Sequence, residues 1–292
     1  MKFTNKHNLP DPMYAALSSG WKPKSESISV SALIGPPRIR TLTIKHWDEL
    51  VEDVSDRLWA LLGQALHSTL EKYAAGGVVA EMGIKATVDG TVISGRPDFY
   101  NAGVVGDYKI TSVFSFLLGI KEEWTMQLNF YSHLLRGSNL PVTALNIHAI
   151  LRDWVENKTL TDKDYPKIPF VTVPVTLWTP DDCMAYIKDR VRRHISSPMD
   201  ACSDAERWAR ATTYAVFKVG NKRALRVLDT LDSANKWGLE HHEKNPKDKL
   251  EIHERPGSFV RCERFCAVKS FCDINPYNNP AAEQSAEGWE EL

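Results

Sequence analysis

The chain has 292 residues, of which 43% are hydrophobic and 25% charged, and its 36 basic and 37 acidic residues give a formal net charge of −1. This composition excludes a small single module and a disordered chain, and the charge excludes a protein that coats a polyanion with its whole surface. The longest uncharged apolar stretches, 110–120 and 168–180, are shorter than the ~18–20 residues that a membrane-spanning helix needs. We therefore expect no membrane span. The N-terminus lacks the pattern of an export signal, so we expect a cytoplasmic location, or the host cytoplasm if a phage encodes the chain.

The first 40 residues are rich in proline, serine and glycine, and we expect an extended N-terminal lead over residues 1–45. From Trp47 to about Tyr73, apolar residues recur every three or four positions, which predicts an amphipathic helix. Three β-rich runs with short turns between them follow, and this pattern predicts an antiparallel meander. The three runs span residues 78–88, 91–100 and 104–110.

The next elements complete the predicted core. A helix is expected over residues 122–135, strands over 144–151 and 170–177, and a further helix over 180–194. The order helix, three strands, helix, strand indicates an α/β fold with a mixed central β-sheet flanked by helices, over residues 46–196. Basic and aromatic residues and a cluster of cysteines dominate the rest. We therefore place a boundary near residue 197 and expect a C-terminal appendage, residues 197–292, that packs on the core.

The segment 95–110 carries the residues that say most about chemistry. Asp98 lies near the end of one predicted strand and Asp107 on the next, so the two carboxylates can meet at one rim of the sheet. Asp107 and Lys109 are two residues apart on one strand and so share a face. Two carboxylates at short range favour a hard divalent cation such as Mg²⁺ or Mn²⁺. An ammonium beside them can orient a water molecule or neutralise a phosphate.

Pro97-Asp98 followed by Asp107-Tyr108-Lys109 resembles the signature of the PD-(D/E)XK nucleases. The signature is degenerate on its own, since aspartate and lysine are common on strand surfaces. The resemblance implies a restriction-endonuclease-like core and metal-dependent hydrolysis of phosphodiester bonds.

Two helical motifs flank this segment and resemble the RecB-like branch of that superfamily. His67 comes four residues after Gly63 on the preceding helix, and Gln127 and Tyr131 are four residues apart on one face of the following helix. In that branch the imidazole is an extra metal ligand, and the glutamine and tyrosine contact the substrate or support the lysine. The motifs also follow the family order, over roughly residues 60–151.

The resemblance implies that His67, Asp98 and Asp107 hold the divalent ion. It also implies that Lys109 positions the attacking water. Each of these residues, taken singly, also has a purely structural interpretation. Glu81, which opens the first β-rich run, is interpreted as structural, with a role around the metal as the alternative.

Three cysteines, Cys262, Cys266 and Cys272, lie close together near the C-terminus. Five unevenly spaced cysteines favour reduced thiols or a metal centre over disulfides. The triplet resembles that of the iron–sulfur nucleases of the RecB-like group, including AddB and the CRISPR-associated adaptation exonucleases, which implies a [4Fe–4S] cluster. Those proteins generally supply a fourth cysteine from the N-terminal side, where this chain has residues 34–38 and no cysteine. A cluster needs four thiolates, so we expect Cys202 as the fourth ligand. Zn²⁺ or simply reduced thiols are the alternatives.

The stretch 208–226 interleaves aromatic and basic side chains. It belongs to a region, Lys188 to Arg226, with ten Lys/Arg and four Asp/Glu, an excess of six positive charges. Aromatic rings stack on unpaired bases and cations follow phosphates, so we expect contacts with single-stranded DNA. The alternative is a small hairpin with buried rings and a solvated basic face. The candidate contact residues are Trp208, Arg210, Lys218, Lys222 and Arg223.

These patterns together predict a metal-dependent DNA nuclease, an exonuclease that acts on single strands or DNA ends. The resemblance implies a role in recombination, repair or phage DNA metabolism, with a recombination or replication protein as partner. One alternative is a non-catalytic DNA-binding or assembly subunit, which would bind DNA without turnover. The other is a structure-selective endonuclease, which would cut circular single strands.

Overall fold

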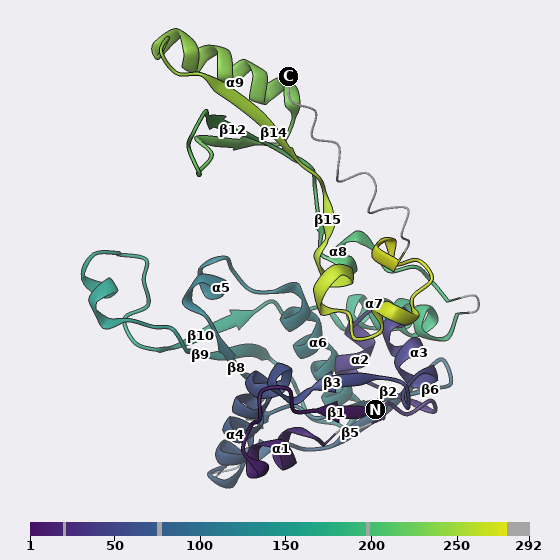
Figure 1. Cartoon of the computed structure of the whole chain (residues 1–292). Helices are drawn as coiled ribbons and strands as arrows, with labels where there is room; N and C mark the ends of the chain where they lie inside the picture. Colours follow the sequence, from purple (N-terminus) through teal and green to yellow (C-terminus); the bar gives the residue numbers. More distant parts are fainter. Residues whose placement is uncertain (20–21, 75–77, 197–198, 279–292) are drawn as a thin grey trace. The chain divides into compact units, whose positions relative to one another are not determined.

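The structure is a computed structural model that describes residues 1–19, 22–74, 78–196 and 199–278. The chain divides into two compact units, Met1–Asp200 and Ala201–Leu292 (Figure 1). The boundary that we expected near residue 197 falls outside the described residues. No described helix is both long and apolar enough to cross a membrane.

The larger unit is built on a five-stranded mixed sheet. Its strand order is β10-β9-β8-β7-β4, in which β8 and β9 run parallel and the other neighbours run antiparallel. These strands are β4 (Val79–Ala80), β7 (Phe99–Asn101), β8 (Val104–Thr111), β9 (Ala144–Leu151) and β10 (Phe170–Val175). A second, three-stranded sheet has the order β2-β6-β5, with β2 (Ser27–Ser29), β5 (Ile84–Val88) and β6 (Thr91–Gly95). The predicted α/β fold with mixed sheets flanked by helices is confirmed.

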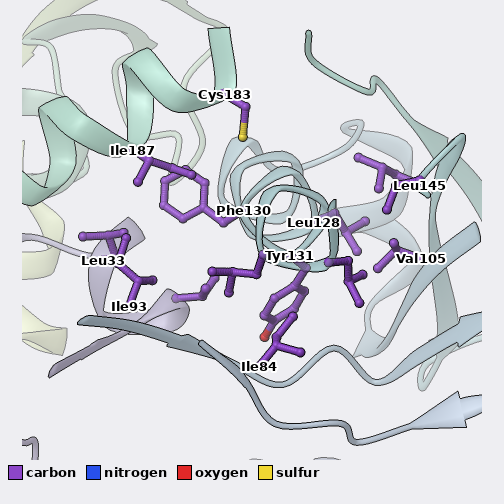
Figure 2. Close-up of a cluster of buried hydrophobic side chains, with 14 of the residues drawn as sticks. Leu33, Ile84, Ile93, Val105, Leu128, Phe130, Tyr131, Leu145, Cys183 and Ile187 are labelled. Atoms are coloured by element: carbon purple, nitrogen blue, oxygen red, sulfur yellow. The ribbon is translucent and has the colours of Figure 1, made fainter. Parts of the chain in front are cut away.

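Helix α6 (Glu122–Gly137) forms the centre of the hydrophobic core. Eight of its 16 residues are buried, as expected for a helix that is covered on several sides. Figure 2 shows Val105 and Leu145 of the five-stranded sheet on one side of α6, and Ile187 of α7 (Pro180–Ile195) on the other. Helix α6 is therefore held firmly against strand β8, which carries Asp107 and Lys109.

The five-stranded sheet has two unlike faces. Along β9, buried residues alternate with half-buried ones over the whole strand. The buried residues of β9, which face α6, are Leu145, Ile147, Ala149 and Leu151. The residues of β8 that pair with them also face α6, because directly paired residues of neighbouring strands point to the same side of the sheet. We call the opposite face, which carries Tyr108 and His148, the outer face.

Helix α4 (Leu58–Lys72) is shorter than predicted. We expected it to begin at Trp47, but residues 51–53 form β3, which pairs with β1 (Lys2–Thr4), and the 3₁₀ turn Val54–Arg57 follows. The Asp53 carboxylate explains the late start, since it accepts hydrogen bonds from the Thr4 hydroxyl at 2.7 Å and from the Lys6 N–H at 2.9 Å. These contacts tie the segment to the N-terminus instead of to a helix.

The predicted antiparallel pairings form, but the three runs do not make one meander, because they are divided between two sheets. The runs 78–88 and 91–100 each break in two, and their halves join different sheets. The first run breaks at Glu81, which has a left-handed backbone (φ 50°), and the second breaks before Pro97-Asp98, where proline has no N–H for a ladder hydrogen bond. Both predicted turns still join antiparallel neighbours: the Asp89-Gly90 turn joins β5 to β6, and the turn at 101–103 joins β7 to β8, each pair within one sheet.

The prediction of an extended lead over residues 1–45 is also wrong. This part of the chain forms α1 (Asp11–Leu17), α2 (Val30–Ile34) and α3 (Pro37–Lys45) as well as two strands. The prolines that indicated turns start helices instead, because the first helical turn does not use the missing N–H.

The smaller unit has a thin core. A three-stranded antiparallel sheet of order β13-β12-β14 carries helix α9 (Leu231–Lys244), and β11 pairs with β15. The strands are β11 (Ala209–Arg210), β12 (Thr213–Lys218), β13 (Arg226–Leu228), β14 (Leu250–Arg255) and β15 (Ser258–Phe259). Its buried apolar residues, among those described, are Ala215, Val216, Ala234 and Val268. The predicted C-terminal, cysteine-containing region is present as this unit.

Candidate functional site

Three residues from separate segments form a candidate metal centre. His67 on α4, Glu81 after β4 and Asp98 before β7 each place a ligand atom within 4.8 Å of the others. His67 Nδ1 lies 3.2 Å from Asp98 Oδ1 and 3.3 Å from Glu81 Oε1. Carboxylate oxygens suit hard divalent ions such as Mg²⁺ and Mn²⁺, and an imidazole suits the transition metals. This is the only such group within the described parts of the chain.

Backbone contacts fix both carboxylates. The Tyr108 N–H donates to Asp98 Oδ2 at 2.6 Å, which leaves Asp98 Oδ1 directed at the imidazole. The Glu81 N–H donates to the Asp98 carbonyl oxygen at 3.2 Å. The left-handed backbone of Glu81 is unfavourable for a residue with a side chain, and such conformations cluster at functional sites.

A second set of side chains links β8 to α6. Lys109 Nζ lies 2.5 Å from Asp107 Oδ2 and donates to Gln127 Oε1 at 3.1 Å. The Gln127 amide in turn donates to the Tyr131 hydroxyl at 3.1 Å. Burial raises the pKa of Tyr131 far above its ordinary value, so its hydroxyl stays protonated. In this arrangement the glutamine and tyrosine hold the lysine in place.

Asp107 lies beside the metal centre but is not one of its three members. It is 1% exposed, and Oδ2 has no hydrogen-bond partner among the described residues besides its ion pair with Lys109. Burial raises the pKa of Asp107, while the Lys109 ammonium opposes this shift and the Asp98 carboxylate adds to it. We expected Asp107 as a ligand and Glu81 as structural; the geometry groups Glu81 with His67 and Asp98 instead.

The charges of this centre favour a cation. Burial, and then the nearby Asp98 carboxylate, raise the pKa of Glu81. The pKa of His67 is raised mainly by its hydrogen bond to Asp98, although burial opposes the shift. The carboxylates thus repel one another and draw a proton onto the imidazole. A divalent ion would relieve the same repulsion, and the donor set fits one.

The centre opens into a cleft of about 260 Å³. Besides His67, Glu81 and Asp98, its walls include the rings of Phe99 and Tyr108. The acids therefore face a cleft whose walls are partly aromatic.

The sequence around Glu81 does not indicate its place in the metal centre, because that place depends on a residue far along the chain. The Glu81 carboxylate stands at the start of a β-rich run, but the pattern of that run does not show that the chain breaks there. The break turns Glu81 towards Asp98, which is 17 residues further along the chain.

The four cysteines expected at a cluster lie in the smaller unit and are not in disulfides. Burial is the main cause that raises the pKa of Cys202, and the thiols of the other three, Cys262, Cys266 and Cys272, add to it. No three of these sulfur atoms lie within 4.8 Å of one another among the described residues. Cys183 is buried in the larger unit (Figure 2).

The residues expected to contact DNA lie on different elements of the smaller unit. Trp208 packs on Phe265, with ring centroids 5.5 Å apart. The Arg261 guanidinium lies over the Trp208 ring, with Cζ 4.2 Å from the ring centroid. Lys218 Nζ is 2.5 Å from Asp248 Oδ1. The remaining three, Arg210 on β11 and Lys222 and Arg223 between β12 and β13, are exposed.

No protein-family model matches the chain, and no curated protein matches it. Among solved structures, a protein designated SSO0001 is 18% identical with a TM-score of 0.42, over 61% of this chain and 81% of the other. An alkaline exonuclease from Laribacter hongkongensis is 11% identical with a TM-score of 0.39, over 64% and 91%. An exonuclease candidate from Eubacterium rectale is 12% identical with a TM-score of 0.30, over 63% and 79%. At these scores the likeness decides nothing about activity, so function is inferred from the site itself.

Proposed function

We propose that the protein is a metal-dependent DNA nuclease of the RecB-like PD-(D/E)XK type, which hydrolyses phosphodiester bonds in single strands or at DNA ends. One observation carries the proposal: the His67, Glu81 and Asp98 cation site lies beside the Asp107–Lys109 pair of β8, whose intervening Tyr108 N–H binds the Asp98 carboxylate. The restriction-endonuclease-like core, the cytoplasmic location and a role in recombination, repair or phage DNA metabolism belong to the same proposal.

Each residue has a defined task in this mechanism. His67, Glu81 and Asp98 would hold Mg²⁺ or Mn²⁺, with Asp107 as a further ligand. A bound divalent ion would activate water and stabilise the charge that builds on the phosphate oxygens. The Tyr108 N–H keeps Asp98 in its ligating orientation.

Lys109 supplies the positive charge that faces the phosphate or the attacking water. Its ammonium is held between the Asp107 carboxylate and the Gln127 amide oxygen, so it does not need to be ordered when substrate arrives. Tyr131 orients Gln127 from inside the core.

The test is a nuclease assay on end-labelled single- and double-stranded DNA, with Mg²⁺, with Mn²⁺ and with a chelator. We expect metal-dependent degradation that falls by roughly 100-fold or more in Asp98→Asn and Lys109→Ala. Lys85→Ala changes an exposed lysine on β5 and serves as the matched control. Unchanged activity in both site variants would refute the assignment.

The same assay separates the competing functions. A circular single strand resists an exonuclease, which needs an end, and is cut by a structure-selective endonuclease. A non-catalytic DNA-binding or assembly subunit would bind the labelled DNA without degrading it under any metal condition.

We also propose that Cys202, Cys262, Cys266 and Cys272 bind a metal centre in the smaller unit. Their mutual electrostatic influence supports this grouping. A [4Fe–4S] cluster and a Zn²⁺ ion both accept four thiolates, so the cysteine set fits either centre, and metal analysis of the purified protein distinguishes them.

The exposed basic residues of the smaller unit are proposed to contact DNA phosphates. Arg210, Lys222 and Arg223 support this, since all three are exposed, and Trp208 is 40% exposed. Lys218 would contribute less, because Asp248 already neutralises its charge.

A further inference from the structure

Four rings lie side by side on the outer face of the five-stranded sheet. Phe99, Tyr108, His148 and Phe170 come from β7, β8, β9 and β10, one ring from each strand. Tyr108 pairs directly with His148, which in turn pairs with Thr172 of the edge strand, so these residues share the face opposite α6. We call these four side chains the aromatic row.

Neighbouring rings of the aromatic row are in contact distance. Ring centroids lie 5.5 Å apart for Phe99 and Tyr108, 5.7 Å apart for Tyr108 and His148, and 5.2 Å apart for Phe99 and His148, so these three rings all contact one another. The His148 and Phe170 rings are nearly parallel, with an interplanar angle of 9° and centroids 6.1 Å apart. Aromatic pairs are favourable over about 4.5–7 Å, so the row is a continuous aromatic surface.

The sequence around the row keeps these rings in place. The Phe99 ring lies across β8 directly over Gly106. A Cβ atom at position 106 would come within 1.9 Å of this ring, so the ring can take this place only because residue 106 is a glycine. His148 Nδ1 is 2.9 Å from the Thr172 hydroxyl, which holds the imidazole. Burial lowers the pKa of His148, so near pH 7 it presents a neutral, flat ring.

The aromatic row is continuous with the candidate active site. Phe99 and Tyr108 line the same cleft as His67 and Asp98, and the His67 and Tyr108 rings meet edge to face at 6.4 Å. At its other end the row reaches Phe170, which is 40% exposed on the edge strand β10. The row therefore leads from the outer edge of the sheet into the cleft.

The chemistry of the row and its surroundings selects one kind of occupant. Unpaired bases stack on aromatic faces regardless of sequence, whereas the bases of a duplex are already stacked on one another. A cation lies near the same sheet: exposed Arg152, directly after β9, stacks 4.1 Å from the Trp59 ring of α4, which is 62% exposed. An anionic chain of flat bases matches this combination of rings and a cation.

We propose that the aromatic row binds the bases of single-stranded DNA and guides the strand into the cleft. The inference rests on the proposed nuclease function and adds a substrate class to it, because a stacking surface favours unpaired strands over duplex ends.

The test is a binding measurement in which no cleavage can occur. Fluorescence anisotropy of the full chain with a labelled thymidine oligonucleotide, in EDTA, compares wild type with Phe170→Ala and Phe170→Trp. We expect Phe170→Ala to weaken binding roughly 5-fold or more, and Phe170→Trp to retain it. Phe114→Ala removes an exposed phenylalanine of α5 (Val113–Leu117), 69% exposed and outside the row, and should leave binding unchanged.

An abasic oligonucleotide of equal length and charge provides the second comparison. We expect it to bind more weakly than the thymidine strand and to be insensitive to Phe170→Ala. Equal binding of both strands, equal effects of Phe170→Ala and Phe114→Ala, or an equal loss of duplex binding in Phe170→Ala would each overturn the proposal.

Failure of this inference and failure of the proposed function are distinguishable. Degradation that depends on Asp98 and Lys109, together with unchanged binding in Phe170→Ala, rejects only the aromatic row. Base-dependent binding without any degradation supports the row and rejects only the nuclease. Photocrosslinking with 5-iodouracil in the strand gives an independent readout, with the adduct expected on the peptide that contains His148 or Phe170.

Discussion

Glu81 shows how far a site can depend on the backbone of one residue. Its left-handed conformation brings a carboxylate to His67 and Asp98, at a cost of order 1–3 kcal/mol in local strain. Arg96 Nε is 3.7 Å from Glu81 Oε2, so the carboxylate has a cationic neighbour on its solvent side. Glu81 therefore differs from a surface glutamate in both position and surroundings.

We expect Glu81→Gln to weaken Mn²⁺ binding by at least about 10-fold, because substitutions one layer outside a metal centre already cost that much. Isothermal titration with Mn²⁺ measures this directly, without DNA. The isosteric change keeps the backbone contact to Asp98, so the metal-free protein should remain folded. Glu122→Gln, an exposed residue at the start of α6, is the control, and equal affinities in the two variants would remove Glu81 from the centre.

We expect stability in acid to depend on a buried histidine far along the chain from this site. His194 is 6% exposed; its Nε2 lies 3.2 Å from the Leu33 carbonyl oxygen, and Nδ1 has no partner among the described residues. Burial, aided by the Arg190 charge, lowers the pKa of His194 from 6.5 to about 4. Between these values the unfolded chain binds the extra proton, so this contribution to stability is complete above pH 6.5 and is lost as the pH falls towards 4.

His194→Gln should therefore flatten the fall in unfolding free energy between pH 6.5 and 4, by up to roughly 3 kcal/mol. Urea unfolding at several pH values measures the slope, and His7→Gln, at an exposed position, should leave it unchanged. A steep slope that persists in the His194 variant would assign the acid sensitivity to other groups.

Residues related by a local period could be predicted from the sequence. Asp107 and Lys109 share a face because strands alternate, and Gln127 and Tyr131 share one because helices repeat. The contact between Gln127 and Lys109 depends on how α6 packs on β8. It could not be predicted from the repeat of either element alone.

Long elements with a clear period were predicted well, and short ones were not. Strand β9 has the predicted bounds, and α6 ends two residues after the predicted end. The two-residue β4 and three-residue β7 offer no period to detect, and their places depend on pairing with each other. The segments that hold Glu81 and Asp98 are therefore the ones that local patterns describe least.

One buried side chain joins α6 to the segment that leads into α7. Asn129 is fully buried; its amide donates to the Thr125 and Thr176 carbonyl oxygens, both at 2.9 Å, and its Oδ1 accepts from the Trp178 N–H at 2.8 Å. Through these hydrogen bonds the fully buried Asn129 fixes the end of β10 relative to α6.

We expect Asn129→Ala to lower the free energy of unfolding by roughly 2–4 kcal/mol, since the substitution removes three hydrogen bonds of a fully buried side chain and leaves a cavity. Urea denaturation measures the loss. Asn101→Ala, at an exposed position on β7, should change stability by less than about 0.5 kcal/mol. A loss of similar size in both variants would contradict this role for Asn129.

The two units differ in how their folds are stabilised. The larger one surrounds α6 with residues of two sheets and two helices, so burial of apolar surface is enough to hold it together. The described buried apolar residues of the smaller one are two alanines and two valines, which supply little hydrophobic stabilisation. A small unit of this kind usually needs a disulfide or a metal, and its cysteines form no disulfide.

The neighbourhood of the cysteines is held by contacts between separate segments. The Arg261 guanidinium donates to the Glu206 carbonyl oxygen at 2.8 Å, and the Phe259 N–H donates to the Tyr277 hydroxyl at 2.9 Å. Such single, partly exposed hydrogen bonds contribute about 1 kcal/mol each, so they do not replace a cross-link that closes loops of tens of residues.

A metal centre at Cys202, Cys262, Cys266 and Cys272 should therefore control the stability of the smaller unit alone. In anaerobically purified protein, we expect visible absorption and four iron atoms per chain for a [4Fe–4S] cluster, or a colourless protein with one Zn²⁺. Hydrogen–deuterium exchange after metal removal, or in Cys262→Ser, should accelerate in β11, β15 and the segment 261–278, while amides of α6 and β9 keep their protection. Cys183→Ser changes a buried thiol of the larger unit and should leave exchange in the smaller one unaltered. A metal-free wild-type protein with full protection in the smaller unit would show that four thiols close to one another serve no metal here.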